Sequence, residues 1–132
     1  MMRRIPLLLA LAALACRTPA DRRAERDGPD PRLVRQVGGF RGPESVRYDP
    51  ERDVYYVSNM VLYGSWKDDN GYIVVLAAGD LDSAEVLVQG GTGGATLHAP
   101  KGMAIHGDTL WVADIDVLRG FHRVTGAPLA TI

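Results

Sequence analysis

Cysteine is nearly absent from this sequence, which has one cysteine, Cys16, among 132 residues. A single cysteine cannot form a disulfide within the chain, and it excludes a zinc site built from several cysteines. The net charge is only −1, which excludes a general electrostatic attraction to nucleic acid. No G-x-S-x-G motif occurs, so the serine nucleophile elbow is excluded as well. What is present, 46% hydrophobic and 23% charged residues, is typical of one globular domain.

The first 15 residues have the pattern of an export signal. Arg3 and Arg4 supply positive charge, and residues 5–15 form an uncharged, apolar run of 11 residues. As a helix this run would span about 16 Å, well short of the roughly 30 Å hydrocarbon core of a bilayer. We therefore predict that residues 1–15 are a cleaved signal peptide and not a membrane-spanning helix.

The run ends in Ala13, Leu14, Ala15 and Cys16, which resembles the lipobox of bacterial lipoproteins. That motif prefers Leu at the position of Ala13 and a small residue at that of Leu14, whereas Ala15 and Cys16 agree with it. Two interpretations follow: acylation of Cys16, or an ordinary signal peptide that is cleaved near a cysteine. The first predicts a lipid anchor in the bacterial cell envelope, at the periplasm or outer membrane, because acyl chains bind membranes in proportion to their length. The second predicts a secreted protein.

Residues 16–36 are predicted to be a flexible or lipid-anchored tether. Residues 17–35 contain six arginines and four acidic residues, with too few apolar side chains to pack a core. The arginines either contact phosphate headgroups or are simply solvated. From residue 36 onward, seven basic and twelve acidic residues leave a net charge of −5, which argues against nucleic acid as a partner.

A repeated pattern divides the rest of the chain, residues 37–132, into two units. In each unit a proline, a charged residue, a small residue and an apolar strand precede a turn and an aromatic-containing strand that ends in Asn or Asp. The first copy runs from Pro43 to Asn59 and the second from Pro100 to Asp114, so the offset is 57 residues at the start and 55 at the end. This spacing indicates structural repeats of about 55 residues.

Each repeat is predicted to form four short β-strands, because β-branched and aromatic residues alternate with polar ones between turn residues. Four-stranded repeats near this length are typical of β-propeller blades, whereas a β-sandwich would not repeat the motif at this interval. The expected fold class is all-β, a partial β-propeller with two of about six blades. The expected strands are residues 46–48, 54–57, 72–76, 85–88, 100–105, 109–114, 120–123 and 130–132.

Two blades cannot close a propeller ring, which needs roughly four to eight. We therefore expect either that the chain is the N-terminal fragment of a longer protein or that other chains complete the ring. The open blade edges would then be free to associate with one another.

The motifs within the repeats resemble exported bacterial members of the senescence-marker-protein, gluconolactonase and luciferin-regenerating-enzyme-like family. The likeness covers residues 39–132, about the first third of a six-bladed propeller. The motifs that carry it are Gly-Pro-Glu-Ser-Val-Arg-Tyr-Asp-Pro at 42–50, Tyr-Val-Ser-Asn at 56–59, Asp-Asn-Gly-Tyr-Ile at 69–73, Ala-Pro-Lys-Gly-Met-Ala-Ile at 99–105 and Leu-Trp-Val-Ala-Asp-Ile-Asp at 110–116.

The resemblance implies a divalent metal, often calcium, at the mouth of a central channel, and hydrolysis of lactone rings or related esters. Glu44 stands at the place of the family's first-blade acidic ligand. Lys101 stands where the family has an acidic residue in its Pro-Asp-Gly-Met-Ala pattern, so no metal role is transferred to it. The remaining ligands of the family belong to later blades.

Antiparallel geometry brings the candidate residues together. The start of one strand lies beside the end of the next, so we expect Glu44 near Asn59 and Lys101 near Asp114 on one rim. Carboxylate and amide oxygens are suitable ligands for Ca²⁺. Glu44 is either a metal ligand or a strand-end acid, Asn59 is a ligand or a turn residue, and Lys101 and Asp114 are expected to form a rim salt bridge. Asp116 is a weaker candidate.

Two function classes remain open. In the first, the completed propeller is a metal-dependent hydrolase of a lactone or ester, and the isolated chain has little or no activity. In the second, the propeller is a non-enzymatic binding module of the envelope that holds a sugar, a small ligand or a protein. His98 precedes an inner strand and is a candidate to face the channel, and the apolar segment 60–67 is a candidate pocket wall or packing surface.

Overall fold

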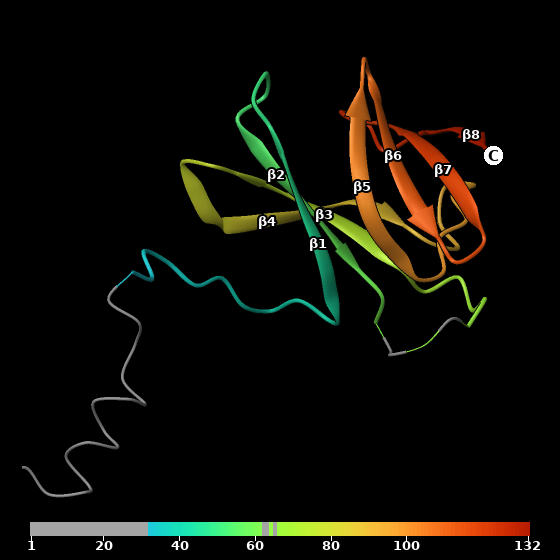
Figure 1. Ribbon diagram of the computed structural model, residues 1–132, viewed down its shortest axis with the longest axis horizontal. Coiled ribbons are helices and arrows are strands. Elements are labelled where there is room, and N and C mark those ends of the chain that lie inside the picture. The colour runs from blue at the N-terminus through green and yellow to red at the C-terminus, as the bar shows by residue number, and fades with distance from the viewer. Residues whose placement is uncertain (1–31, 62–63, 65) are drawn as a thin grey trace, which may run out of the picture. The chain divides into compact units, whose positions relative to one another are not determined.

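The computed structural model of the chain describes residues 32–61, 64 and 66–132 (Figure 1). The chain divides into two units, Met1–Gln36 and Val37–Ile132, and the fold described below is that of the second. The predicted signal peptide, residues 1–15, and the predicted lipidation site at Cys16 lie outside the described residues.

Within the described residues the protein is all-β and has no helix, as predicted. The strands form two four-stranded antiparallel sheets, with the orders β1-β2-β3-β4 and β5-β6-β7-β8. Each repeat of the sequence thus forms one sheet whose strands follow in chain order. The strands are β1 (Pro43–Asp49), β2 (Val54–Asn59), β3 (Tyr72–Ala77), β4 (Asp80–Gln89), β5 (Pro100–His106), β6 (Thr109–Asp114), β7 (Val117–His122) and β8 (Pro128–Thr131).

The two sheets have the same register between their first and second strands. Val46 pairs with Val57 and Tyr48 with Tyr55 in the first sheet, and Met103 pairs with Val112 and Ile105 with Leu110 in the second. Because alternate residues of a strand point to opposite sides, each sheet has two faces. We call the side that carries these paired residues face A, and the opposite side face B. Face B includes Tyr56, Ser58, Ile73 and Val75 in the first sheet and Ala104, Trp111, Ala113 and Leu118 in the second.

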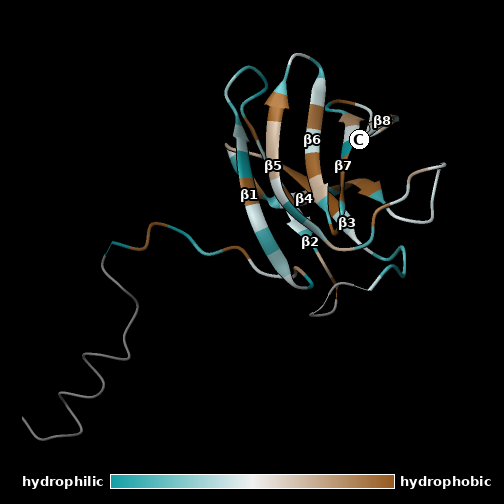
Figure 2. Cartoon of the chain, turned by 45° about the vertical axis from the view of Figure 1, so that its right-hand side comes forward, coloured by the Kyte–Doolittle hydropathy of each residue, from teal (hydrophilic) through white to brown (hydrophobic). Residues whose placement is uncertain are grey.

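The main hydrophobic core lies between face B of the first sheet and face A of the second. The contacts between the sheets centre on β1 and β5, the first strand of each, which lie side by side in both views (Figures 1 and 2). Along β6 strongly hydrophobic colouring alternates with paler colouring, as expected for a half-buried strand (Figure 2). The buried members of this core are Tyr56, Ile73, Val88, Ala95, Leu97, Leu110, Val112 and Phe121.

The second sheet approaches the first so closely that a turn glycine is required. Gly126, in the β7–β8 turn, has φ 70°, and a Cβ at this position would collide with the carbonyl oxygen of Leu87 in β4. Only glycine combines this left-handed conformation with such an approach at no steric cost. The turn therefore fixes the outer part of the second sheet against β4.

A buried polar cluster joins the sheets at the end that carries the β1–β2 and β5–β6 turns. Asp49 is buried and accepts two hydrogen bonds from Nη1 of Arg123, at 3.0 and 3.1 Å. The hydroxyl of Tyr56 lies 2.8 Å from the carbonyl oxygen of Arg123 and accepts a hydrogen bond of 2.8 Å from Arg52. The cluster thus connects the end of β1 to the residue that follows β7, and it aligns the two sheets.

Candidate functional site

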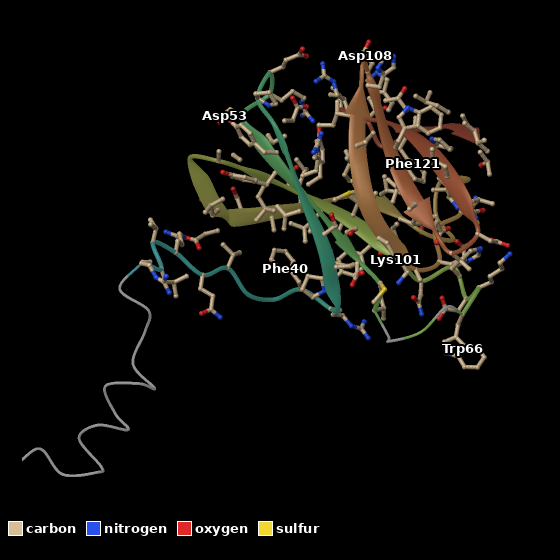
Figure 3. The ribbon with its side chains drawn as sticks, in the orientation of Figure 1. Phe40, Asp53, Trp66, Lys101, Asp108 and Phe121 are labelled. Carbon is tan, nitrogen blue, oxygen red and sulfur yellow. The ribbon has the colours of Figure 1, made fainter. Side chains whose placement is uncertain are left out.

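The opposite end of the sheet pair carries the residues that the sequence analysis selected. The register pairs Pro43 with Asn59 at one sheet and Pro100 with Asp114 at the other. Ser58 joins the two sheets there, because its hydroxyl donates a 2.8 Å hydrogen bond to the carbonyl oxygen of Lys101. We call this end the rim. Lys101 and Trp66 lie at this end in Figure 3, and Asp53 and Asp108 lie at the other.

Glu44 lies in a β-bulge at the start of β1. The pairing shifts from Pro43 opposite Asn59 to Ser45 opposite Ser58, so Glu44 is the extra residue between them. Bulges of this kind re-aim a side chain and are frequent beside functional sites. Glu44 is exposed, so its carboxylate is accessible from solvent at the rim, and its backbone lies beside the end of β2.

Asn59 is the last residue of β2 and is fully buried. Its Nδ2 donates a 3.0 Å hydrogen bond to the carbonyl oxygen of Val57. Its Oδ1 is buried and has no hydrogen-bond partner within the described part of the chain. An unpartnered buried oxygen is unfavourable by about 1–3 kcal/mol. A cation or a donor group at this position would remove that cost.

The predicted salt bridge between Lys101 and Asp114 is wrong. Asp114 is buried and pairs with Arg119 at 2.5 Å, and its carboxylate also accepts hydrogen bonds from the backbone N–H groups of His98 and Ala99. Arg119 reaches it because the two residues lie on the same face of neighbouring strands. The β5–β6 register is irregular between Pro100 and Met103, so Lys101 is not placed opposite Asp114.

Lys101 instead contacts the first sheet. Its Nζ lies 3.4 Å from Sδ of Met60, the buried residue that follows β2. Together with the hydrogen bond from Ser58, this contact holds the start of β5 against the end of β2. The positive charge of Lys101 is therefore at the rim, next to the strand end that carries Asn59.

His98 has a structural contact. Its side chain is mostly buried, and its Nδ1 accepts a 2.9 Å hydrogen bond from the backbone N–H of Asp69. Asp69 has φ 56°, and its carboxylate accepts a 2.6 Å hydrogen bond from the N–H of Leu97. These bonds connect the β2–β3 loop to the segment before β5. Asp69 was noted only as part of the 69–73 motif of the family resemblance, and the Asn-Gly turn signal at 70–71 could have indicated its role in this loop.

Two further candidates lie in this region. Asp116 is exposed and forms a 2.7 Å ion pair with Lys67, whose hydrogen bond lowers the pKa of the Asp116 carboxyl. Trp66 is 71% exposed, so this part of the segment 60–67 presents a large apolar side chain to solvent at the rim (Figure 3). The Met60 end of the same segment is buried against the start of β5.

The oxygen atoms at the rim can be compared with the ligands that calcium requires. In the described ranges, no cluster of three or more His, Cys, Asp or Glu side chains could hold a metal ion. The rim oxygens that the sequence singled out are the Glu44 carboxylate, which is exposed, and Oδ1 of Asn59, which is buried and has no partner among the described residues; Oδ1 of Asn70 is buried and unpartnered as well. Ca²⁺ takes 6–8 oxygen ligands of these kinds. Glu44 and Asn59 thus supply two oxygens of suitable kinds, which is fewer than a calcium ion needs.

In the part of the chain that the structure describes, no helix has the length and apolar character needed to cross a membrane. Comparison of the chain with protein-family models, with curated proteins and with solved structures found no match.

Proposed function

We propose that residues 37–132 are two neighbouring blades of a β-propeller of the gluconolactonase-like class. Three features of the fold support this proposal. Each sheet has four antiparallel strands in chain order, the first strands β1 and β5 are adjacent, and the second sheet packs its face A on face B of the first. Such packing repeats radially in a propeller. The motif likeness of the two sheets to that family supports the same assignment.

In the completed ring, we propose, Glu44 and Asn59 contribute oxygen ligands to a divalent cation, calcium or another metal, that serves hydrolysis of a lactone or related ester. The observation that carries this proposal is the buried, unpartnered Oδ1 of Asn59 beside the bulge that carries Glu44. When bound, such a metal polarises a carbonyl and activates a water. Burial of Asn59 restricts its side chain to one position, and the exposed Glu44 is free to close on an ion.

A binding module is the second candidate, and it is favoured by Lys101 and Trp66. Lys101 places a positive charge at the rim where the resembled enzymes have an acidic residue. Trp66 is 71% exposed at the same end, and exposed aromatic rings of this kind bind sugars and other small ligands through their faces. In this function the rim would hold a ligand without chemical change.

Calcium titration by calorimetry distinguishes the two candidates. The full chain, Glu44→Gln and Glu85→Gln are titrated with CaCl₂; Glu85 is an exposed carboxylate on β4, away from the rim. We expect heat of binding from the wild type and from Glu85→Gln, and a loss of at least tenfold in affinity for Glu44→Gln, since one charged ligand is removed. Absence of binding by all three proteins would overturn the metal site and leave the binding module.

We also propose that the protein is exported and held at the cell envelope by an acylated Cys16, which would place the rim near envelope ligands. Mass spectrometry of the protein purified from membranes tests this step. A mature N-terminus at Cys16 with the added mass of acyl chains is expected. An unmodified Cys16 would overturn the lipid anchor.

A further inference from the structure

Face A of the first sheet is an open apolar surface. Val46 is 63% exposed and Tyr48 is 43% exposed, although both lie on strand β1 beside buried or half-buried neighbours of β2. A hollow of about 400 Å³ lies on this face. Val37 and Phe40 pack over one part of the face, against Val57, Val74 and Leu76, and no other described residue is packed on the part formed by β1.

Face B of the second sheet is open in the same way. Leu118 is 38% exposed, Ala104 is exposed and Trp111 is partly exposed. Gly120 makes room for the Trp111 ring, because a Cβ there would lie only 3.0 Å from Cζ3 of the tryptophan. None of the residues named here carries a charge, whereas His106 and His122 lie on the same face at the end with the β5–β6 turn. A partner could therefore cover the part around Trp111 and Leu118 without desolvating an ion.

The contact between the two sheets shows which surface fits each open face. In that contact, face B of one sheet receives face A of the next. The two open surfaces are one face A and one face B, with the same register as the pair already in contact. They point away from each other on opposite sides of the sheet pair, so one copy cannot bring them together.

Equivalent positions support this fit. Tyr56 and Trp111 both lie on face B of the second strand of their sheet, and each pairs in register with the third strand. Tyr56 is fully buried by the second sheet, whereas Trp111 is covered by no other sheet in the described part of the chain. Val46 and Tyr48 correspond to Met103 and Ile105, which pack in the core. The open faces thus carry apolar and aromatic residues at the positions where the buried faces carry them.

We propose that this chain associates head to tail with further copies of itself, face A of the first sheet of one copy packing on face B of the second sheet of the next. The contact is heterologous, so it adds copies until a ring closes or a filament grows. The proposal rests on the packing of the sheets and not on the metal site or on hydrolysis, so loss of calcium binding would leave it intact.

The full chain has a net charge of only −1, so long-range charge repulsion contributes little to its association. The residues named on the two open faces carry no formal charge, so added salt should leave the contact itself unweakened. Association that persists from low to moderate salt is therefore part of the expectation. Association by ion pairs would weaken instead.

Two single substitutions and their mixture test the proposal by sedimentation of the full chain in a non-ionic detergent. Val46→Lys places a charge on face A of the first sheet, and Leu118→Lys places one on face B of the second. Val124→Lys is the matched control, because Val124 is 49% exposed in the β7–β8 turn, on neither face. Tyr48→Lys replaces Val46→Lys if circular dichroism shows that the latter is unfolded.

The wild type and Val124→Lys should form oligomers whose mass rises with concentration, up to a fixed size if a ring closes and without limit if a filament grows. Each face variant alone should stay monomeric. An equimolar mixture of Val46→Lys and Leu118→Lys should form a dimer and nothing larger, because each partner retains one functional face. A wild type that is monomeric at all concentrations would overturn the proposal. So would face variants that still associate, which would indicate pairing of strand edges or of the N-terminal segment.

Discussion

Tyr56 and Trp111 occupy equivalent positions in the two sheets, and their surroundings differ. Both lie on face B of a second strand, and both follow a turn by a few residues. Tyr56 is fully buried, and its hydroxyl contacts Arg52 and the backbone of Arg123. Trp111 is larger and more apolar but is only partly buried. The burial of a side chain in this protein is therefore set by the sheet that lies next to it, and not by its own hydrophobicity.

The same comparison applies to the strand ends at the rim. Asp114 and Asn59 close equivalent strands, and both are buried. The carboxylate of Asp114 is satisfied by Arg119 and by two backbone N–H groups, whereas Oδ1 of Asn59 has no partner among the described residues. Asp114 is thus a structural residue, and Asn59 is the strand-end residue whose oxygen is unpartnered.

Replacing Tyr56 and Trp111 by alanine should give the largest difference in the free energy of unfolding. Tyr56→Ala removes a fully buried ring, so we expect the free energy of unfolding to fall by about 3–5 kcal/mol. Trp111→Ala should cost clearly less when the protein is dilute, because part of the ring is already in water. Urea denaturation followed by circular dichroism measures both. Equal losses at low protein concentration would contradict the difference in burial that the structure describes.

Replacing Asp49, the acid that joins the two sheets, should have the next largest effect on the free energy of unfolding. Asp49→Ala leaves Arg123 without its buried partner, and we expect a loss of about 3 kcal/mol in the free energy of unfolding. Asp116→Ala is the control, since its ion pair with Lys67 is exposed and should contribute nothing measurable. Hydrogen exchange should show that Asp49→Ala loosens β1 and β5 together. Loosening confined to β1 would argue against coupling of the sheets.

The smallest effect on stability is expected from the titration of Tyr56 at alkaline pH. Burial raises the pKa of the Tyr56 phenol above its ordinary value of about 10. The unfolded chain therefore loses this proton at lower pH than the folded chain, so stability present below pH 10 falls as the pH rises further. Tyr56→Phe should reduce the slope of this fall, measured by urea denaturation between about pH 9 and 11. An unchanged slope would show that Tyr56 does not titrate with unfolding.

Tyr48→Phe provides the comparison for that experiment. The pKa of Tyr48 is also raised, chiefly by its 2.7 Å hydrogen bond to Asp53, but the ring is exposed on β1. Solvent screens such a surface contact, so Tyr48→Phe should change the slope less than Tyr56→Phe. A larger change of slope for Tyr48→Phe than for Tyr56→Phe would contradict the expectation that the buried tyrosine has the stronger effect.

Much of the strand pattern was predictable because it depends on local periodicity. The two repeats and the all-β class followed from alternation and turn residues, and the structure confirms both. The end of β2 and the start of β1 were expected to meet, and the register pairs Pro43 with Asn59. The start of β4 was not predicted: it begins at Asp80, five residues before the expected strand, because polar residues are tolerated at an exposed part of a sheet.

The partners at the rim could not be predicted from strand order alone. Lys101 and Asp114 lie on neighbouring strands, but a register irregularity separates them, and Arg119 from a third strand pairs with the acid instead. His98 was a candidate for the channel, and its Nδ1 accepts a hydrogen bond from Asp69 in a loop 29 residues away in the sequence. Contacts of this kind depend on side-chain direction and on loops from other elements.

The amino-acid sequence by itself determined the repeat, the eight strands and the neighbourhood of Glu44 and Asn59, because periodicity and antiparallel pairing act over short distances. Only the tertiary structure decided that one aromatic face is buried and its equivalent is open, and that one strand-end oxygen is satisfied and its equivalent is not. Burial and hydrogen bonding depend on which sheet packs against which, and that packing brings together residues far apart in the chain.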